Sequence, residues 1–424
     1  MKKNFQSIRG MHDFLPKDLS IFNNIKNILI KILNNYCYSE INMPILENTN
    51  LFTRTIGNIT DIVEKEMYSF TDQSGNSLTL RPEGTVGCVR ACIENGLIYN
   101  QIQKLWYLGP MFRYERPQKG RYRQFYQLGV EAFGFDGPDI DVELIMLTVR
   151  WWKKLNLLPY LNLEINSIGS LQSRLIYQKE LIIFLNKNKL SLDLESRKKI
   201  LTNPLRILDT KNKNVQLLLK QGPKLHDYFD KPSYVYFEQL CQLLDSMNIN
   251  YQINSLLVRG LDYYNDTVFE WTTKYLGSQN TICAGGRYNS LVSYIGNQSV
   301  PAIGLALGME RLMLLFKNIY QTSCIKSNFS IDINILFSNY TIESMQLAEE
   351  IRNKFPNLKV MINYSGGSIK KQLKKANKFF TLIVLFFFKN KNHEFVVSMQ
   401  NLKKNSVIYL FKHEVIETLS KIFN

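Results

Sequence analysis

Cysteine and histidine are scarce in this 424-residue chain, and neither occurs in a pattern that binds a metal. The six cysteines include no CxxC pair, and the four histidines are scattered. Structural zinc sites need such residues at short spacing, and small secreted folds need cysteines that pair as disulfides. We therefore expect no zinc and a reduced protein.

Long hydrophobic runs are also missing. The longest, FFTLIVLFFF at residues 379–388, is shorter than the roughly 20 residues that cross a bilayer. The N-terminal MKKNFQSIRG has no apolar core of the kind found in signal peptides. We expect a cytoplasmic protein with no membrane partner.

Common nucleotide-binding and nucleophile motifs are absent as well. The chain has no G-x-x-x-x-G-K-[ST] loop, no G-x-G-x-x-G after a strand-like run, and no local Ser-His-Asp or Cys-His signature. These absences disfavour P-loop enzymes, dinucleotide-binding folds and enzymes that use a protein nucleophile.

Positive charge is what the chain has in excess. It carries 52 Lys+Arg against 36 Asp+Glu, a net charge of +16. Six of its 16 arginines fall between Arg81 and Arg123. The planar fork of arginine suits phosphate and carboxylate groups, which indicates an anionic ligand. Codon bias in an AT-rich genome would raise the lysine count by itself, so local arrangement carries more weight than the total.

Hydrophobic periodicity predicts an α/β chain of two domains. We expect an α+β domain over residues 1–325, with antiparallel strands and helices, and an α/β domain over residues 330–424. A composition change near residues 326–330 marks the boundary. Residues 171–251 are rich in Lys, Asn and Gln and lack glycine-rich motifs, which predicts an inserted helical module. The first helix is expected from Leu19 to about Tyr38.

The densest arginine stretch, FRYERPQKGRYRQFYQ at residues 112–127, is predicted to include the loop of a long hairpin. In its second strand, Gln127 and Glu131 share a face with Gly129, because side chains two apart point the same way. We expect Gly129 to leave room for a ligand beside them. A strand with an ordinary solvent face fits the same pattern.

Arginines beside strand-like segments recur later in the chain. Arg259 lies in LVRGLDYYNDTVFEW, and Arg311 follows PAIGLALG in the expected first turn of a helix, where the helix dipole favours an anion. With Arg113 and nearby polar groups, they describe a site that joins a nucleotide to a small zwitterion. The polar groups are Glu83, Gln127, Glu131, Tyr263, Tyr264 and the AGGRY segment.

In this order and at these separations, the motifs resemble those of class II aminoacyl-tRNA synthetases, specifically the bacterial histidyl-tRNA synthetase family. The general class II elements are the Pro44 region, the FRYERPQKGRYRQFYQ hairpin and GLALGMERL. The histidine-specific elements are LVRGLDYYNDTVFEW and AGGRYNSLV, supported by RGMHDFLP and TLRPEGT. The resemblance covers nearly the whole chain. It implies an antiparallel class II sheet flanked by helices, a C-terminal anticodon-binding domain and the ligation of histidine to tRNA.

The resemblance also implies how ATP is bound. Arg113 matches the arginine that grips the α-phosphate, Arg311 matches the one at the γ-phosphate end, and Arg121 helps from the loop. Arg259 matches an arginine beside the α-phosphate. The implied catalytic set is Arg259, Arg113 and Gln127.

Histidine binding is implied at a further group of residues. Glu83 and Thr85 match residues that take the α-amino group, and Gln127 lies near the amino and carboxylate end. Glu131 and Tyr264 match groups that bind the imidazole, with Tyr263 and Tyr288 nearby. The implied partners are L-histidine, ATP with accompanying Mg²⁺, and tRNA(His), in a homodimer formed through the Pro44 region.

Two sets of basic residues remain as candidates for tRNA contacts. Arg116, Lys119 and Arg123 in the hairpin loop suit either the acceptor end or the loop's own structure. In the C-terminal domain, a lysine-rich helix is expected to bury a stripe of Ile369, Leu373, Ala376 and Phe380. Its exposed Lys370, Lys371 and Lys374 can follow a phosphate backbone, although a solvated face with no RNA fits them too.

Two other functions fit parts of the sequence. A synthetase-like regulatory subunit of histidine biosynthesis shares the catalytic fold, but such paralogues generally lack the anticodon domain and the ATP and amino-acid residues that this chain retains. A non-catalytic RNA-binding protein explains the basic charge but not the set Glu83, Gln127, Glu131 and Tyr264. We therefore expect synthetase activity.

Overall fold

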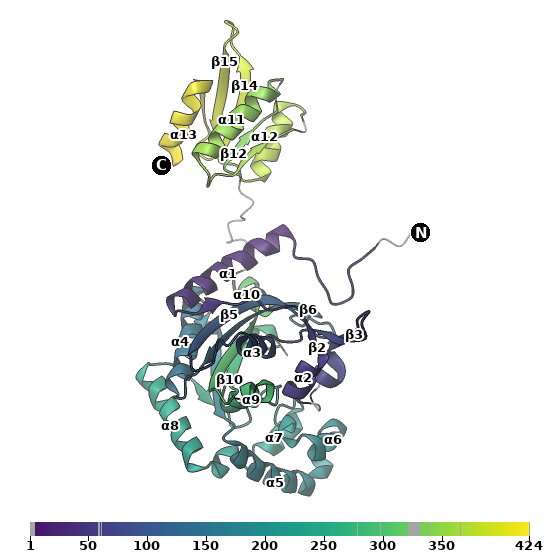
Figure 1. Ribbon diagram of the computed structural model, residues 1–424. Helices are drawn as coiled ribbons and strands as arrows, with labels where there is room; N and C mark the ends of the chain where they lie inside the picture. Colours follow the sequence, from purple (N-terminus) through teal and green to yellow (C-terminus); the bar gives the residue numbers. More distant parts are fainter. Residues whose placement is uncertain are drawn as a thin grey trace. The chain divides into compact units, whose positions relative to one another are not determined.

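The computed structural model describes residues 5–57, 60, 62–277, 279–296, 298–320, 331–337, 339–364 and 366–423 (Figure 1). The chain divides into two compact units, residues 1–14 with 21–322, and residues 15–20 with 323–424. The composition change near residues 326–330 lies outside the described residues. No helix in the described part of the chain is long and apolar enough to span a membrane.

An eight-stranded sheet forms the centre of the larger unit, in the order β1-β5-β6-β11-β10-β9-β7-β8. The pairs from β5 through to β7 are antiparallel, and only the outer strands β1 and β8 pair in parallel with their neighbours. The predicted antiparallel sheet is therefore confirmed. The strands are β1 Ser39–Glu40, β5 Gln103–Phe112, β6 Gln124–Phe133, β7 Asn162–Ser167, β8 Gln252–Ile253, β9 Asn265–Thr272, β10 Thr281–Arg287 and β11 Ala302–Gly308.

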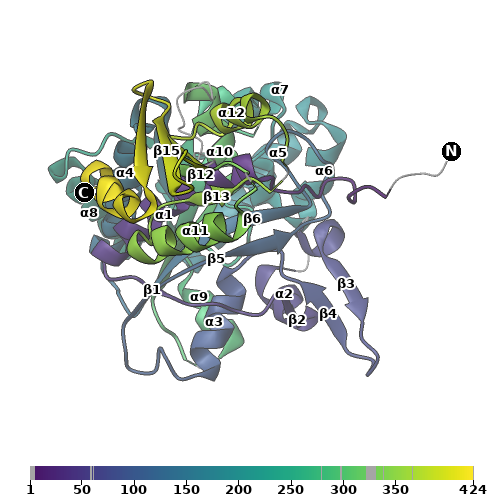
Figure 2. The ribbon, with the colours of Figure 1, turned by 90° about the horizontal axis from the view of Figure 1, so that it is seen from above.

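Helices cover this sheet, and the first one differs from its prediction. It spans Pro16–Asn35, because proline suits the first turn of a helix and Cys37, with φ of 62°, ends the helical path. Helices α3 and α9 pack side by side in both ribbon views (Figures 1 and 2). The helices of this layer are α1 Pro16–Asn35, α2 Thr49–Ile56, α3 Thr85–Glu94, α4 Asp139–Lys154, α9 Asn289–Ile295 and α10 Met309–Tyr320.

A small antiparallel sheet lies beside α2 in the order β2-β4-β3 (Figure 2). Its strands are β2 Leu46–Asn48, β3 Tyr68–Thr71 and β4 Ser77–Leu80. A π-helical turn at Ile62–Glu66 precedes β3. The chain runs directly from β4 through residues 81–84 into α3, so this small sheet leads to the candidate site.

Residues 171–251 form the helices that the sequence predicts. Each of the four begins at a polar residue whose side chain accepts a backbone hydrogen bond, which satisfies a free N–H of the first turn: Ser170, Asp193, Asn212 and Asp230. The helices are α5 Leu171–Lys187, α6 Leu194–Thr202, α7 Lys213–Leu219 and α8 Lys231–Ser246. A 3₁₀ turn at Pro204–Ile207 follows α6.

The smaller unit is an α/β fold with a five-stranded sheet in the order β13-β12-β14-β15-β16. The apolar run predicted as a covered strand forms β14, which is buried over most of its length. The strands are β12 Ile333–Ile335, β13 Val360–Ile362, β14 Ile383–Lys389, β15 Phe395–Asn401 and β16 Ser406–Phe411; the helices are α11 Thr341–Lys354, α12 Ile369–Lys378 and α13 Val415–Phe423.

The apolar stripe predicted on α12 is wrong at both ends. Gln372 and Ala376 are buried, whereas Ile369 is 45% exposed and Phe380 is 73% exposed. Gln372 points inward because its amide accepts from the Phe337 N–H at 2.7 Å and donates to the Gly367 carbonyl at 3.0 Å. The chain leaves the helix before Phe380, which has a φ of 51°. The lysines at 370, 371 and 374 are exposed, as expected.

Candidate active site

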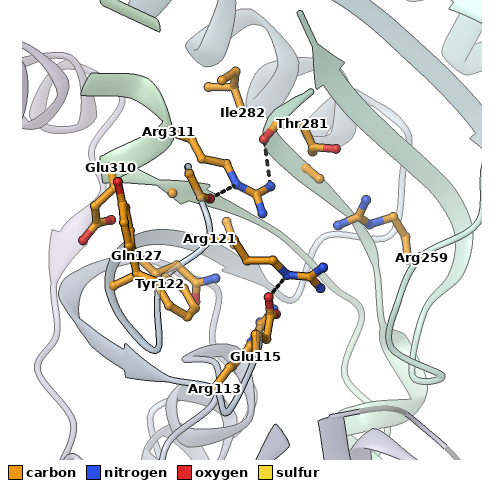
Figure 3. Close-up of a pocket in the computed structure, with 15 residues that line it drawn as sticks. Arg113, Glu115, Arg121, Tyr122, Gln127, Arg259, Thr281, Ile282, Glu310 and Arg311 are labelled. Carbon is orange, nitrogen blue, oxygen red and sulfur yellow. Dashed lines mark hydrogen bonds and ion pairs between the residues drawn. The ribbon is translucent and has the colours of Figure 1, made fainter. Parts of the chain in front are cut away.

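Four arginines and two glutamates line one cavity of the larger unit (Figure 3). They come from the β5–β6 hairpin, from the loop before β9 and from the start of α10, so distant parts of the sequence meet here. Small residues of β10 and β11, among them Ala284 and Ala306, form the floor. The charged residues are Arg113, Glu115, Arg121, Arg259, Glu310 and Arg311.

Arg311 lies in the first turn of α10, as predicted, and its guanidinium is held by three acceptors. It donates to the carbonyl oxygens of Gly120 at 2.9 Å and Thr281 at 3.0 Å, and to Gln279 Oε1 at 3.0 Å. Burial, together with the positive charges of Arg113 and Arg121, lowers the pKa of Arg311 to about 10. An anion bound among these arginines would relieve that repulsion.

The β5–β6 hairpin contributes two of the four cavity arginines, Arg113 and Arg121. Arg113 donates from Nε to the Pro82 carbonyl at 2.8 Å and lies over the ring of Phe125, 5.3 Å from its centroid. Arg121 forms an ion pair with Glu115. The hairpin thus supplies two guanidinium groups and one carboxylate to the cavity.

Arg259 lies on the side of the cavity opposite Gln127 (Figure 3). Its Nη1 contacts Glu270 Oε2 on β9 at 2.8 Å. The Nε of Arg259 is buried and has no hydrogen-bond partner within the described part of the chain. One edge of the guanidinium is therefore fixed by a carboxylate while Nε is unpaired.

Gln127 presents an unsatisfied amide to the same cavity. Its side chain is only 8% exposed, and its Oε1 has no hydrogen-bond partner among the described residues. An unpaired buried acceptor costs about 1–3 kcal/mol. The position suits a ligand that donates a hydrogen bond, such as an ammonium group.

A second group of polar residues surrounds Glu131, which is completely buried. Its carboxylate accepts hydrogen bonds from Thr85 Oγ1 at 2.7 Å, the Tyr107 hydroxyl at 3.0 Å and the Tyr288 hydroxyl at 2.5 Å. Burial nevertheless raises the pKa of Glu131 to about 8. Desolvation of the charged form outweighs the three donors.

Two further tyrosines extend this cluster. The ring of Tyr263 lies 5.8 Å from that of Tyr288 and 4.7 Å from that of Tyr264, measured between centroids. All three are buried. The structure therefore joins the segments LVRGLDYY and AGGRY around one carboxylate.

Glu83 caps the start of α3. Its two carboxylate oxygens accept from the backbone N–H groups of Thr85 and Val86, both at 2.8 Å. Burial raises the pKa of Glu83. This cap fixes Thr85, whose hydroxyl reaches Glu131, so Glu83 is linked to the same cluster.

The expectation that Gly129 leaves room for a ligand is wrong. A Cβ at Gly129 would lie 2.0 Å from the ring of Tyr107, so this tyrosine fills the space. Tyr107 and Gly129 are cross-strand partners in the hairpin. The sequence argument missed Tyr107, although pairing the two predicted strands would have placed it opposite the glycine.

The candidate tRNA residues of the hairpin differ in their surroundings. Arg116 and Lys119 are exposed. Arg123 donates from Nε to the Glu115 carbonyl at 3.2 Å and lies 3.8 Å from the centroid of the Tyr114 ring. Arg123 therefore contributes to the structure of the loop, which is one of the two roles expected for it.

Glu310 is a site residue that the sequence argument also missed. Its carboxylate accepts from the Tyr126 N–H at 2.8 and 3.0 Å, which ties the start of α10 to β6. Burial raises its pKa to about 7. Its position next to Arg311 was the only signal in the sequence.

Comparison with known proteins places these features in a family. A family model described as histidyl-tRNA synthetase matches residues 10–312. The histidine–tRNA ligase of Blochmanniella pennsylvanica is 53% identical, covering 100% of this chain and 97% of that protein. The histidine–tRNA ligase of Buchnera aphidicola is 52% identical, covering 100% and 99%. The crystal structure of apo histidyl-tRNA synthetase from S. aureus matches with a TM-score of 0.79 at 30% identity, covering 98% and 99%.

Proposed function

The chain belongs to the histidyl-tRNA synthetase family, and on that premise we propose which of its residues carry the reaction. Its function is to activate L-histidine with ATP, giving histidyl-adenylate and pyrophosphate, and to transfer histidine to the 3'-terminal adenosine of tRNA(His). The full-length identity to two ligases argues against a regulatory subunit that does not charge tRNA.

ATP binds in the cavity lined by Arg113, Arg121, Arg259 and Arg311. The single observation that carries this proposal is the crowding of positive charge at Arg311, which lines one cavity together with Arg113, Arg121 and Arg259. The triphosphate of ATP would bring negative charge that balances these arginines. Arg311 suits the γ-phosphate end, because it lies at the start of α10 where backbone N–H groups also favour an anion.

Adenylate formation requires the histidine carboxylate to attack the α-phosphate while pyrophosphate leaves. Negative charge grows on the phosphoryl oxygens as the new bond forms. Arg113 and Arg259 approach the cavity from different elements and stabilise that charge. Gln127 holds the amino and carboxylate end, so that the attacking oxygen is already oriented.

The imidazole of histidine is bound near Glu131 and Tyr264, with Tyr263 and Tyr288 close by. A buried carboxylate held by three hydroxyls is a specific acceptor for an imidazole N–H. An amino acid without such a donor would leave buried polar groups unpaired, which disfavours it by roughly 10⁴ to 10⁵. Glu83 and Thr85 serve the amino group.

Mg²⁺ enters with ATP as part of the substrate. Nucleotide-bound Mg²⁺ usually takes one or two protein carboxylates together with phosphate oxygens. Glu115 and Glu310 line the cavity, which fits that requirement. We further propose that the protein is a cytoplasmic homodimer, and that Arg116, Lys119 and the lysines of α12 contact tRNA(His).

The test is exchange of labelled pyrophosphate into ATP, measured with each of the twenty amino acids. Histidine alone should support rapid exchange. Exchange that is absent with histidine but present with another amino acid would reject the assignment.

A further inference from the structure

The segment that carries Arg259, Tyr263 and Tyr264 has no regular secondary structure. Residues 257–264 connect the short strand β8 to β9 without helix or strand. A long backbone hydrogen bond joins this segment to the end of α2, from the Asp262 N–H to the Ile56 carbonyl at 3.3 Å. The Leu257 N–H also donates to the Asn254 carbonyl at 2.9 Å, near the start of the segment. Side-chain contacts therefore have to help keep the three site residues in place.

The helical insertion supplies the first such contact. Arg174 on α5 donates from Nη1 to the carbonyl oxygen of Tyr264 at 2.8 Å. Burial lowers the pKa of Arg174. A charged donor on a carbonyl makes a stronger hydrogen bond than a neutral one, so the backbone of Tyr264 is tied firmly to α5.

The second contact lies on the other side of the loop. Arg206, in the 3₁₀ turn after α6, contacts Asp262 Oδ1 through Nη2 at 3.1 Å. The Arg206 side chain is 15% exposed and the Asp262 side chain is 40% exposed, so the arginine is shielded from water more than its partner. Gly57 leaves room for the Asp262 carboxylate, because a Cβ at residue 57 would lie 2.4 Å from Asp262 Oδ2.

A cavity separates the loop from the insertion between these contacts. Its volume is about 390 Å³, and its lining includes Arg174, Arg206, Asp262 and Tyr264. Apolar residues of the loop and of the insertion belong to one core cluster around this cavity. Polar contacts add to that packing: those of Arg174 and Arg206, and a long one from Asn203 Nδ2 to Asp262 Oδ1 at 3.5 Å.

We propose that Arg174 and Arg206 are positioning residues, through which the helical insertion holds the 257–264 loop in the arrangement that binds histidine. The inference rests on the proposed function, since it assigns an effect on histidine binding. It gives the insertion a role in amino-acid activation, before any tRNA is bound. Arg113, Arg121 and Arg311 lie outside this loop, so ATP binding should depend on it much less.

The experiment measures pyrophosphate exchange by full-length Arg174→Met and Arg206→Met variants. Methionine keeps an unbranched side chain of similar reach but cannot donate. Loss of a charged hydrogen bond should raise the histidine KM by about 5- to 20-fold and lower kcat, because Arg259 shares the loop, while the ATP KM stays within about twofold. Arg197→Met is the matched control, because the side-chain hydrogen bonds of Arg197 to described residues go to the Leu192 and Leu190 carbonyls, both inside the insertion.

A double-mutant cycle of Arg206→Met with Asp262→Asn tests the contact itself. The effects on histidine KM should be less than additive if the two side chains act through each other. An unchanged histidine KM in both arginine variants would overturn the proposal. So would equal increases in histidine and ATP KM, matching Arg197→Met. Absence of histidine-dependent exchange in the wild-type protein would instead reject the proposed function.

Discussion

Tyr288 donates its hydroxyl hydrogen to Glu131 across 2.5 Å, at a point where both side chains are buried. The two residues are 157 positions apart: Tyr288 belongs to the AGGRYNSLV segment, and Glu131 lies on strand β6. Thr85 and Tyr107 complete a shell of three hydroxyls around the carboxylate. The three hydroxyls offset part of the free-energy cost of burying this carboxylate. They also fix the direction from which a fourth donor can approach it.

Removing one of these donors should weaken histidine binding. Tyr288→Phe preserves the ring and deletes the hydroxyl, so Glu131 is less well oriented and less well solvated. A hydrogen bond to an uncharged group contributes about 0.5–1.5 kcal/mol, and the histidine Kd should therefore rise by roughly 2- to 12-fold. Equilibrium binding of histidine measures it, with Tyr99→Phe as the control because Tyr99 is an exposed tyrosine. Equal affinities of the two variants would contradict the prediction.

The buried Glu131 should also make stability depend on pH. Its pKa is about 8 in the folded protein and about 4.3 in an unfolded chain. Between those values the folded state binds a proton that the unfolded state does not, so the free energy of unfolding falls as pH rises. The Tm of ligand-free protein should fall from pH 5.5 to 8.5 more steeply in the wild type than in Glu131→Gln.

Two other buried glutamates should also make stability fall as pH rises. The comparison of wild type with Glu131→Gln cancels their contribution. Burial also raises the pKa values of Glu83 and Glu310, and both are present in either protein. The difference between the two curves therefore isolates Glu131. Parallel curves of Tm against pH would show that Glu131 does not titrate in this range.

Arg259 should act on the chemical step more than on affinity. Its guanidinium is anchored at one edge by Glu270 and lines the cavity that we propose binds ATP, where phosphoryl charge would develop. Arg259→Ala should lower the rate of adenylate formation by about 10²- to 10³-fold while changing histidine affinity little. Single-turnover rates and equilibrium binding separate the two quantities. An equal loss in both would count against the proposed role.

The high density of arginines near the hairpin does not by itself show which of them line the cavity. Arg113 and Arg121 line the cavity. Two other arginines of the six between Arg81 and Arg123 have structural contacts instead. Arg81 donates to the Pro110 and Met43 carbonyls, and Arg90 pairs with Glu47. Density alone could not separate these roles, because carbonyl partners come from distant parts of the chain.

The two wrong predictions, at Gly129 and on α12, have the same cause, which is a tertiary partner that local periodicity does not reveal. Strand periodicity placed Gly129 beside Gln127 and Glu131, but the neighbouring strand supplies Tyr107, which fills the gap. Helical periodicity placed an apolar stripe on α12, but hydrogen bonds from Gln372 turn a polar residue inward. Local patterns give the direction of a side chain, whereas tertiary partners decide what occupies the space in front of it.

Breaking the buried ion pair between Arg287 and Asp141 should destabilise the fold strongly. Arg287 and Asp141 lie 2.8 Å apart and are essentially inaccessible to water, and the Tyr236 hydroxyl donates to Asp141 at 3.1 Å. Asp141→Asn leaves the guanidinium uncompensated and should cost about 3–5 kcal/mol of unfolding free energy. Tyr236→Phe keeps the pair and should cost only about 1 kcal/mol. Denaturant unfolding measures both, and equal costs would contradict the assignment.

The lysines of α12 offer a test of tRNA binding that leaves amino-acid activation intact. Lys370, Lys371 and Lys374 are exposed on one helix of the smaller unit, whereas the cavity arginines belong to the larger one. If each lysine neutralises a phosphate, changing all three to Glu should raise the tRNA KM. The slope of log affinity against log salt should then fall by about 2–3.

Two comparisons decide whether those lysines act through charge on RNA. Pyrophosphate exchange should be unchanged in the triple Glu variant, because it needs no tRNA. The triple Arg variant keeps the charge and should retain the salt slope of the wild type. A Glu variant that charges tRNA with the same KM and salt dependence as the wild type would show that this helix has only a solvated face. Deleting residues 330–424 would then be the way to ask whether another surface of the same unit binds tRNA, since charging should fall while exchange persists.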